Sequence, residues 1–491
     1  MRTLIERAHQ HASRQAIISD GKTYSYKDLL DASGRVASML LDGRSDLGES
    51  CVAFLVTPGF GYVAVQWGIW RAGGIAVPLC AQHPLPALRY VVEDTEPVAL
   101  VSDADHDEVM NTLAEEVGLP LRTLSQTESA ESMPLPIVDA QRRAMILYTS
   151  GTTGKPKGVV TTHDVIEAQI QTLVNAWAWE ADDHILNILP LHHVHGIINV
   201  LSCALWSGAT CTFLPKFEAK RVWDLFNEGA INVFMAVPTV YYKLIAYWKA
   251  ASAKEQQKMS DSLRPFRLMV SGSAALPVPV LETWRSISGH TLLERYGMTE
   301  IGMGLGNPYD GERRPGHVGV PFPGVQVRLV NEEGLDVQVG QPGEILIKSP
   351  TVFKEYWGKP EATDKAFVEG WFKTGDTAVL NNGYYQILGR NSVDIIKSGG
   401  YKISALQIEE VLLRHPEINE CAVVGLPDEE WGEVIGACLV IQGREIDEEA
   451  LKSWARERLP AYQVPRRYIV RDTLPRNTLG KVTKNEVKIL F

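Results

Sequence analysis

A segment rich in glycine, hydroxyl groups and lysine follows an apolar run of strand length, Ala144 to Leu147. Glycines let backbone N–H groups turn toward an anion, while hydroxyls add donors and lysines add positive charge. The composition therefore predicts a loop that binds phosphate, and the alternative for a short run of this kind is a polar surface turn. The candidate ligand-contacting residues in the segment are Thr149, Ser150, Gly151, Thr152, Thr153, Gly154, Lys155 and Lys157.

The spacing of this segment differs from that of the usual mononucleotide P-loop, which has four residues between its first glycine and its Gly-Lys pair. Here two residues separate Gly151 from Gly154, and Pro156 follows Lys155. Proline disfavours helix at the preceding residue and removes a backbone donor. The segment is therefore a different kind of phosphate loop.

A carboxylate and a hydroxyl follow a second apolar run, because Leu292 to Met298 predicts a strand that leads into Thr299 and Glu300. Carboxylates suit Mg²⁺, which typically bridges one or two side chains to substrate phosphates. A Thr-Glu pair taken alone would more often cap a helix. Arg267 to Pro277 predicts another strand that ends in small residues, where a flat ring could lie or where the strand could simply pack closely on a helix.

Three other polar groups have both a structural and a chemical interpretation. Asp376 lies in a Thr-Gly-Asp turn, where it could bond its own backbone or accept from both hydroxyls of a ribose. Lys481 follows a glycine near the end of the sequence, as any surface lysine could. The run from Leu191 to His195 holds three histidines but not the His-Glu-x-x-His spacing of a zinc protease, so we expect these histidines to line a pocket or bond the backbone.

The composition indicates a soluble globular protein of more than one domain. The chain has 491 residues, a length that exceeds what one hydrophobic core usually supports. Hydrophobic residues make up 45% of it and charged residues 22%, as in typical globular proteins. Its net charge of −11 argues against a nucleic-acid surface or an anionic membrane as partner. Six dispersed cysteines predict a reducing compartment, and no apolar run reaches the roughly 18 residues of a membrane span. The sequence does not indicate an oligomeric state.

The elements that position these groups alternate between strand and helix. The hydrophobic pattern predicts a strand from Ser50 to Leu55, a helix from Val63 to Ala72 and a strand from Ile75 to Leu79. This alternation favours an α/β fold with largely parallel sheets. A polar stretch near residue 390 precedes a tail with its own alternating elements. We therefore expect a large N-terminal domain of mixed, largely parallel sheets with helices over residues 1–389 and a small mobile α+β domain over residues 390–491.

These motifs together resemble the adenylate-forming superfamily of acyl-CoA synthetases, adenylation domains and luciferases. The matching motifs occur in the superfamily's order from residue 149 to residue 481, and they include Tyr-Gly-Met-Thr-Glu, Thr-Gly-Asp and Pro-Arg-Asn-Thr-Leu-Gly-Lys. The resemblance implies ATP, Mg²⁺ and coenzyme A as cofactors and the phosphate segment above as a nucleotide site. By resemblance the other nucleotide or cofactor contacts are Gly272, Ser273, Ala274, Glu294, Tyr296, Gly297, Asp376, Arg390, Gly399, Gly400 and Lys402.

The resemblance also implies a two-step mechanism in which a carboxylate attacks ATP and the acyl-adenylate then reacts with the thiol of CoA. Lys481, Thr299 and Glu300 would be the catalytic residues, with Glu300 as the metal ligand. The small domain would rotate between the steps about a hinge at Ser392, which withdraws Lys481 and presents the segment from Gly399 to Lys402. Ser271, His195 and Arg295 would bind the acyl substrate.

Arg295 limits the class of acid that the site could accept. It directly precedes the Tyr-Gly-Met-Thr-Glu motif, where, by resemblance, the strand borders the acyl pocket. A guanidinium can bind a second carboxylate bidentately, and a fatty acid would leave it unpaired. The structural alternative is a pair with Glu294. The segments Glu294 to Glu300, Leu189 to Gly196 and Val393 to Lys402 resemble the malonyl-CoA synthetase branch, which also uses methylmalonate.

The sequence thus predicts an acid–thiol ligase that acts on malonate or methylmalonate. One alternative is a medium-chain or aryl monocarboxylate acyl-CoA synthetase with a structural Arg295, and another is a protein that binds acyl or adenylate ligands without turnover. An adenylation domain that loads a carrier protein is a further alternative, although no carrier segment follows. The segment Val393 to Lys402 resembles the mitochondrial type of this branch. No transit peptide is evident, so we expect a cytoplasmic protein.

Overall fold

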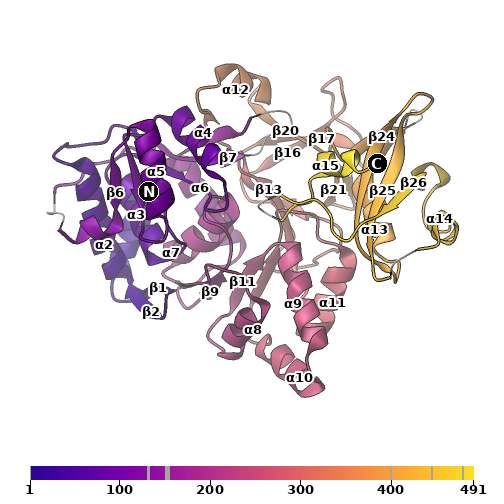
Figure 1. Ribbon diagram of the computed structural model, residues 1–491, viewed down its shortest axis with the longest axis horizontal. Coiled ribbons are helices and arrows are strands. Elements are labelled where there is room, and N and C mark those ends of the chain that lie inside the picture. The colour runs from indigo at the N-terminus through magenta and orange to yellow at the C-terminus, as the bar shows by residue number, and fades with distance from the viewer. Residues whose placement is uncertain (1, 130–132, 150–154, 399–400, 444–445, 478–479) are drawn as a thin grey trace.

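The computed structural model describes residues 2–129, 133–149, 155–398, 401–443, 446–477 and 480–491. Its first two-thirds contain two sheets flanked by helices, and its last hundred residues form a further sheet at one end of the molecule (Figure 1). The sequence prediction of an α/β fold is therefore confirmed.

A large sheet runs in the order β15-β14-β13-β12-β11-β9-β10-β1-β2. The pairings from β13 to β1 are parallel, and the strands at either end pair antiparallel. Because the carboxyl ends of parallel strands meet at one edge, the residues after β12 and β13 come together there. The strands are β1 (Gln15–Ser19), β2 (Lys22–Ser25), β9 (His184–Asn187), β10 (Thr210–Phe213), β11 (Val233–Ala236), β12 (Leu268–Ser271), β13 (Leu293–Met298), β14 (Gly302–Gly306) and β15 (Val320–Pro321).

A second sheet runs in the order β18-β8-β7-β4-β3-β5-β6 and is parallel from β7 to β6. The hairpin of β7 and β8 forms its antiparallel part, and β18 adds to the outer side of β8. Its strands are β3 (Cys51–Leu55), β4 (Ile75–Pro78), β5 (Ala99–Ser102), β6 (Leu121–Thr123), β7 (Arg143–Thr149), β8 (Lys157–Thr162) and β18 (Glu355–Tyr356).

Two smaller sheets complete the fold, and antiparallel pairing dominates both of them. One runs β16-β17-β20-β19 with β21 on β20, and the other runs β23-β22-β25-β24 with β26 on β25. The strands are β16 (Gln326–Val330), β17 (Gly343–Lys348), β19 (Phe367–Val368), β20 (Trp371–Asn381), β21 (Tyr384–Arg390), β22 (Ile395–Ser398), β23 (Tyr401–Ser404), β24 (Ile418–Asp428), β25 (Gly432–Ile441) and β26 (Arg467–Val470).

The helices cover the sheets, and side-chain caps begin four of the described helices, α2, α10, α13 and α14. Ser25 and Asp28 form a capping box at the start of α2, and the Asp447 side chain accepts from two backbone amides at the start of α14. The helices are α1 (Arg2–Gln10), α2 (Tyr26–Leu41), α3 (Phe60–Arg71), α4 (Leu85–Thr95), α5 (Asp107–Val117), α6 (His163–Ala176), α7 (Cys203–Ser207), α8 (Ala219–Asn227), α9 (Pro238–Ala250), α10 (Ala253–Ser262), α11 (Val278–Ser288), α12 (Pro360–Ala366), α13 (Ala405–Leu412), α14 (Glu448–Arg456) and α15 (Lys484–Ile489).

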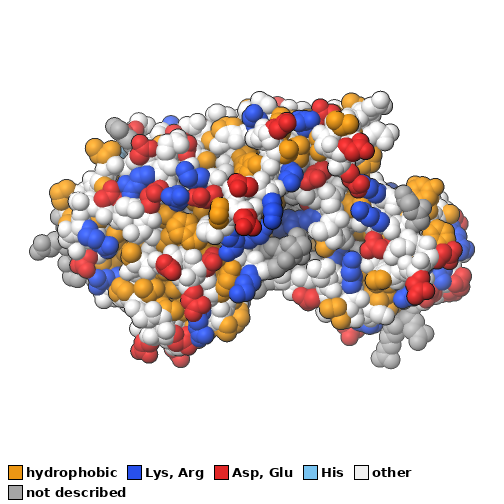
Figure 2. Space-filling view, turned by 90° about the horizontal axis from the view of Figure 1, so that it is seen from above, with side chains coloured by type: hydrophobic (Ala, Val, Ile, Leu, Met, Phe, Trp, Pro, Cys, Tyr) orange, Lys and Arg blue, Asp and Glu red, His pale blue; other side chains and the backbone are white. Residues whose placement is uncertain are grey.

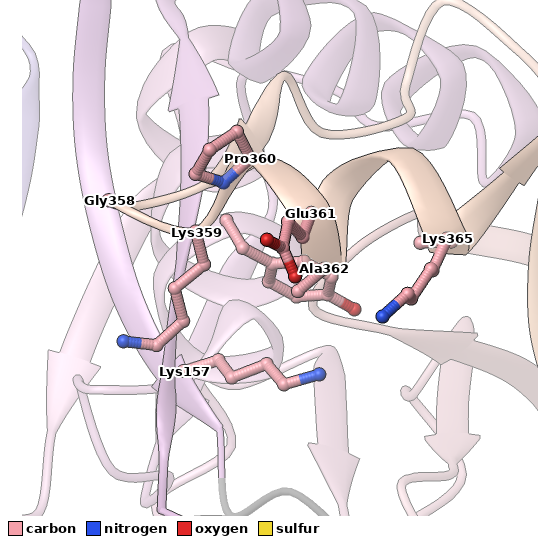
Figure 3. Close-up of a pocket in the computed structure, with 9 residues that line it drawn as sticks. Lys157, Gly358, Lys359, Pro360, Glu361, Ala362 and Lys365 are labelled. Atoms are coloured by element: carbon pink, nitrogen blue, oxygen red, sulfur yellow. The ribbon is translucent and has the colours of Figure 1, made fainter.

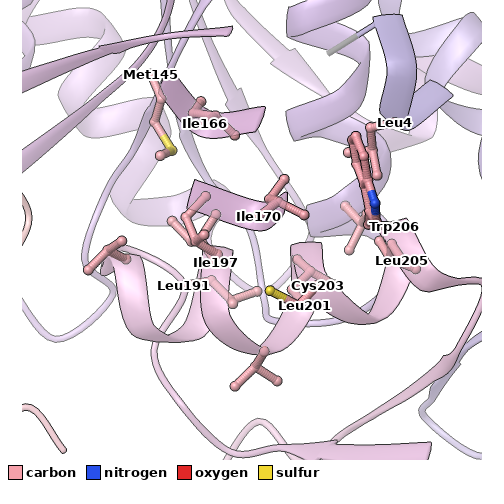
Figure 4. Close-up of a cluster of buried hydrophobic side chains, with 14 of the residues drawn as sticks. Leu4, Met145, Ile166, Ile170, Leu191, Ile197, Leu201, Cys203, Leu205 and Trp206 are labelled. Carbon is pink, nitrogen blue, oxygen red and sulfur yellow. The ribbon is translucent and has the colours of Figure 1, made fainter. Parts of the chain in front are cut away.

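A π-helix over His195–Ser202 runs into α7 and carries one of the candidate site residues. Its apolar side chains, including Ile197 and Leu201, lie beside Ile166 and Ile170 of α6 in the main core (Figure 4). All eight residues of the π-helix are buried. Such wide turns occur often at functional sites, and the packing here fixes the position of the first residue, His195.

The expected elements occur with small shifts in their bounds. The helix predicted from Val63 to Ala72 is α3, and the apolar runs on either side of it are β3 and β4. The tail contains the expected helices and strands as α13, β24, β25 and α14. It has its own buried clusters around Ile403 and around Val424. In the described part of the chain no helix is long and apolar enough to cross a membrane.

Candidate active site

The predicted phosphate loop connects β7 to β8, and Thr149 pairs with Lys157 across this hairpin. Lys157 Nζ lies 4.8 Å from the centre of the Tyr356 ring, and Lys155 Nζ lies 5.6 Å from that of Tyr90. Both lysines therefore stand at the mouth of the hairpin, where a phosphate chain would meet them. The remaining predicted loop residues, Ser150, Gly151, Thr152, Thr153 and Gly154, lie outside the described residues.

Glu300 lies in the turn that follows β13, as the sequence predicts, and Thr299 precedes it. Its side chain is buried, and the Tyr356 hydroxyl donates to its Oε1 at 3.0 Å. Burial raises the pKa of Glu300 above its usual value, so the carboxylate gains from a nearby cation. The described residues contain no cluster of three or more His, Cys, Asp or Glu that could hold a metal. A single held carboxylate fits Mg²⁺, which keeps several waters and substrate oxygens as ligands.

Tyr296, Asp376 and Arg390 meet between two sheets. The Tyr296 hydroxyl donates to Asp376 Oδ2 at 2.6 Å, and Arg390 Nε lies 3.3 Å from Asp376 Oδ1. Asp376 and Arg390 are direct partners in the β20–β21 ladder, so the backbone register places them together. Burial raises the pKa of the Asp376 carboxyl despite the nearby Arg390 charge. These three residues, which the resemblance assigns to the nucleotide, thus form one contact group.

The small residues after β12 allow close approach of Arg295. A Cβ atom on Gly272 would lie 2.5 Å from the Arg295 Cζ atom, so a larger residue there would displace the guanidinium. Ser273 has a φ of 68° and accepts a hydrogen bond from Arg295 Nη2 at 3.2 Å. Ser271 is fully buried beside them, and Ala274 continues the turn. The predicted small-residue turn thus serves to admit an arginine.

His195 joins this group through Ser273, whose Oγ lies 3.1 Å from His195 Nδ1. Because the Ser273 hydroxyl accepts from Arg295, its own proton can go to Nδ1, and the His195 proton then sits on Nε2. His195 Nε2 is buried without a partner among the described atoms. Burial, and then the positive charge of Arg295, holds the pKa of His195 well below its usual value. His195 is therefore neutral and presents an N–H donor.

Arg295 is 3% exposed, and burial lowers its pKa to about 9. Its Nε has no partner, and no described carboxylate lies within ion-pair distance of it. The neighbouring Glu294 points to the other face of β13, accepts from the Leu276 amide at 3.3 Å, and has a pKa raised to about 8 by burial. The alternative of an Arg295–Glu294 pair is therefore wrong within the described residues. An unpaired buried guanidinium calls for an anionic ligand.

Lys481 approaches the same group from the tail, where its backbone amide donates to Asn477 Oδ1 at 3.0 Å. Desolvation, followed by the charges of Arg390 and Arg295, lowers the pKa of Lys481 to about 8, and Asp376 opposes this shift. The same lysine helps to lower the pKa of His195. The side chain keeps contact with solvent, so it stands at the mouth of the site rather than in its floor.

Lys402 is the predicted site residue that lies apart from this group. It is exposed on β23, and its Nζ lies 2.7 Å from the Glu332 carboxylate after β16. Gly399 and Gly400 fall outside the described residues. Gly297 lies on β13, and a Cβ atom at this position would come 2.1 Å from the Gly302 carbonyl oxygen, so a larger residue would not fit there.

Tyr356 is a site residue that sequence patterns did not reveal. It lies 56 positions from Glu300, so no local motif connects the two residues.

Comparison with known proteins identifies the family of the chain. The sequence profile of the family described as "AMP-binding enzyme" matches residues 4–357, and that of the "AMP-binding enzyme C-terminal domain" matches residues 407–481. The mitochondrial malonate–CoA ligase of Bos taurus is 45% identical over 98% of this chain and 89% of its own length. A malonate–CoA ligase of Arabidopsis thaliana is 40% identical over 98% of this chain and 87% of its own length.

Among solved structures, the chain is similar to ATP-bound MatB from Rhodopseudomonas palustris. The TM-score is 0.91 and the identity 34%, with 99% of this chain and 98% of the other covered. The sequence profiles, the relatives and this structure agree over nearly the whole length. The chain belongs to the AMP-binding enzyme family, among its AMP-forming acyl-CoA ligases.

Proposed function

We propose that the protein is a malonate–CoA ligase that also accepts methylmalonate. The observation that carries this proposal is Arg295, a buried guanidinium without a carboxylate partner in the described part of the chain. A dicarboxylate would supply that partner, whereas a monocarboxylate would leave the charge unpaired at a cost of several kcal/mol. The names of the relatives from Bos taurus and Arabidopsis thaliana support the same substrate.

In the first step, one malonate carboxylate attacks the α-phosphorus of ATP while Arg295 binds the other. The neutral His195 donates from Nε2 toward the acyl group, so the substrate is held at both ends. Such fixed geometry converts a bimolecular encounter into an oriented one. Asp376 would accept from the ribose hydroxyls, with Arg390 and the Tyr296 hydroxyl holding its carboxylate in place.

Negative charge accumulates on the phosphates in this step, and Lys481, Lys155 and Lys157 offset it. Glu300 would hold Mg²⁺, which supplies charge stabilisation at the leaving pyrophosphate. Lys481 must carry its proton to bridge the α-phosphate and the acyl oxygen. Its lowered pKa of about 8 leaves it mostly protonated near neutral pH, and bound anions would raise that pKa further.

In the second step, the thiol of CoA attacks the acyl-adenylate and AMP leaves. We propose that residues 390–491 move as a domain relative to residues 1–389, with Ser392 as the hinge. The separate sheet and separate buried clusters of the tail support this division. The ion pair of Lys402 with Glu332 connects the two parts, so the movement would release Lys402 for CoA.

A panel of acids tests the substrate. AMP and pyrophosphate release would be followed with ATP, Mg²⁺ and CoA across malonate, methylmalonate, succinate, acetate, octanoate and benzoate. We expect malonate and methylmalonate to be preferred and Arg295→Ala to lose that preference. Arg285→Ala, an exposed position on α11, is the matched control. A preference for octanoate or benzoate that Arg295→Ala leaves unchanged would support the monocarboxylate alternative, and no turnover with any acid would support the non-catalytic one.

The location and assembly of the protein are open to direct measurement. All six cysteines are free and buried, which fits a reducing compartment, and we propose the cytoplasm. Fractionation of cells that express the protein tests this location, and recovery in the mitochondrial fraction would contradict it. Sedimentation of the purified protein would give its oligomeric state.

A further inference from the structure

A hollow of about 620 Å³ lies next to the candidate site, between β8, β18 and α12 (Figure 3). Lys157, Tyr356, Lys359, Glu361 and Lys365 contribute its polar lining. Its volume falls within the range of about 300–1,000 Å³ that is typical of small-molecule pockets. The hollow opens to solvent near a face on which Lys and Arg side chains gather around a central depression (Figure 2).

Two lysines in this hollow form no ion pair with a described carboxylate. Lys359 Nζ lies 3.4 Å from Asp94, but neither Lys157 nor Lys365 has a carboxylate within ion-pair distance in the described ranges. Their ammonium groups reach toward the same space from opposite sides (Figure 3). Glu361 stands on the α12 wall and opposes them with one negative charge. Two convergent ammonium groups suit a diphosphate-type oxyanion, which spreads its charge over two phosphorus centres.

Tyr356 connects the hollow to the site. Its ring lies below Lys157 Nζ, and its hydroxyl donates to Glu300, the proposed magnesium ligand. Lys157 is also the last predicted contact residue of the phosphate segment, where it pairs with Thr149. A group that leaves the region of Glu300 past Tyr356 therefore enters the hollow between Lys157 and Lys365.

We infer that this hollow is a subsite for pyrophosphate on its way out of the enzyme, with Lys157 and Lys365 as the binding residues. The identity of the leaving group rests on the proposed function, whereas the preference for a diphosphate rests on the lysines alone. Lys365 and Glu361 are exposed, so the site binds weakly, as a release route should. The phosphates of CoA share the same chemistry, and the experiment separates the two sources.

Exchange of labelled pyrophosphate into ATP, with malonate and without CoA, tests the inference. We expect Lys365→Ala to raise the KM for pyrophosphate about two- to fivefold, as loss of one exposed charge contact should. Glu361→Gln should lower it, since the opposing charge is removed. Lys373→Ala, an exposed lysine of β20 outside the hollow, should leave it unchanged. Two substitutions on one helix with opposite effects cannot result from general damage.

The outcomes distinguish this inference from the proposed function. A pyrophosphate KM that is the same in all three variants and the wild type would overturn the subsite, as would a rise in the KM for CoA instead. If another acid supports exchange and malonate does not, the substrate proposal fails and the same comparison is run with that acid. If no acid supports exchange, calorimetric titration of pyrophosphate into wild type and Lys365→Ala gives the affinities directly, and equal affinities would contradict the inference.

Discussion

Lys484 forms a buried ion network that joins three distant parts of the tail, and its removal should be costly. Lys484 Nζ lies 2.6 Å from Asp394 Oδ1 and 2.7 Å from Glu409 Oε1. The lysine side chain is 10% exposed and each carboxylate 14%. Asp394 also accepts from the Arg390 amide at 3.0 Å, so the network reaches the ribose-binding group. Lys484 itself lies three positions after Lys481.

Lys484→Met keeps much of the side-chain volume and leaves two buried carboxylates without their cation. Breaking a buried pair in this way costs about 3–5 kcal/mol, and the residual exposure favours the lower end. With a urea dependence of about 1–3 kcal/mol per molar, a loss of about 3 kcal/mol shifts the unfolding midpoint by about 1–3 M. The tail should therefore unfold well before the rest of the chain.

The pH dependence of this loss has a definite sign. Burial raises the pKa of Glu409 even with Lys484 present, so the folded state disfavours its charged form. The penalty of the variant should be largest at pH values above the raised pKa of Glu409 and should shrink as the pH falls through that pKa and Glu409 takes up a proton. The nearby Asp394 and Glu409 charges raise the pKa of Lys484 further above its usual value, so the wild-type lysine stays charged throughout this window.

Urea unfolding followed by circular dichroism at pH 5 and pH 8 measures both effects. Lys488→Met is the matched control on the same helix, because its Nζ lies 4.0 Å from Glu433 and its side chain is 31% exposed. Lys484→Arg should recover part of the loss, since it restores the charge. A Lys484→Met midpoint equal to that of Lys488→Met at pH 8 would refute the claim that the network stabilises the tail.

Gly272→Ala should raise the KM for malonate at least tenfold and by more than it raises the KM for ATP, because the new Cβ meets Arg295; steady-state kinetics would show equal shifts if this steric argument were wrong. Tyr296→Phe should raise the KM for ATP about tenfold, since Asp376 loses a hydrogen bond to a charged group, and an unchanged nucleotide affinity would contradict it. The kcat/KM for adenylation should fall as pH rises through about 8, when Lys481 loses its proton; Lys481→Arg should lack this fall, and an identical profile would assign the titration elsewhere.

Sequence patterns predicted the site residues that lie close together within one motif. The apolar runs before Thr149 and Glu300 are strands β7 and β13, as local alternation requires. The small residues after β12 were recognised as a place for close approach, but the group that approaches, Arg295, lies on the next strand of the sheet. Local composition indicates that space is needed and does not indicate what fills it.

Contacts between distant segments could not be predicted in this way. The Tyr356–Glu300 hydrogen bond and the network of Asp394, Glu409 and Lys484 depend on the pairing of sheets and helices far apart in the chain. The antiparallel sheet of β16, β17, β20 and β19 was also not foreseen, since the alternation of strand and helix favoured parallel pairing. Tertiary packing determines these features, and one sequence gives no signal for it.

The central claim is that Arg295 binds the second carboxylate of the substrate. Malonate and its monomethyl ester test it most directly, because they share an acyl chain and the ester replaces the second carboxylate with a neutral group that is larger by one methyl. We predict that the wild type prefers malonate about 100-fold in kcat/KM, since the ester leaves a buried guanidinium unpaired. In Arg295→Gln the ratio should collapse to within a few fold. A wild type that uses both equally, or a variant that keeps the full preference, would contradict the claim.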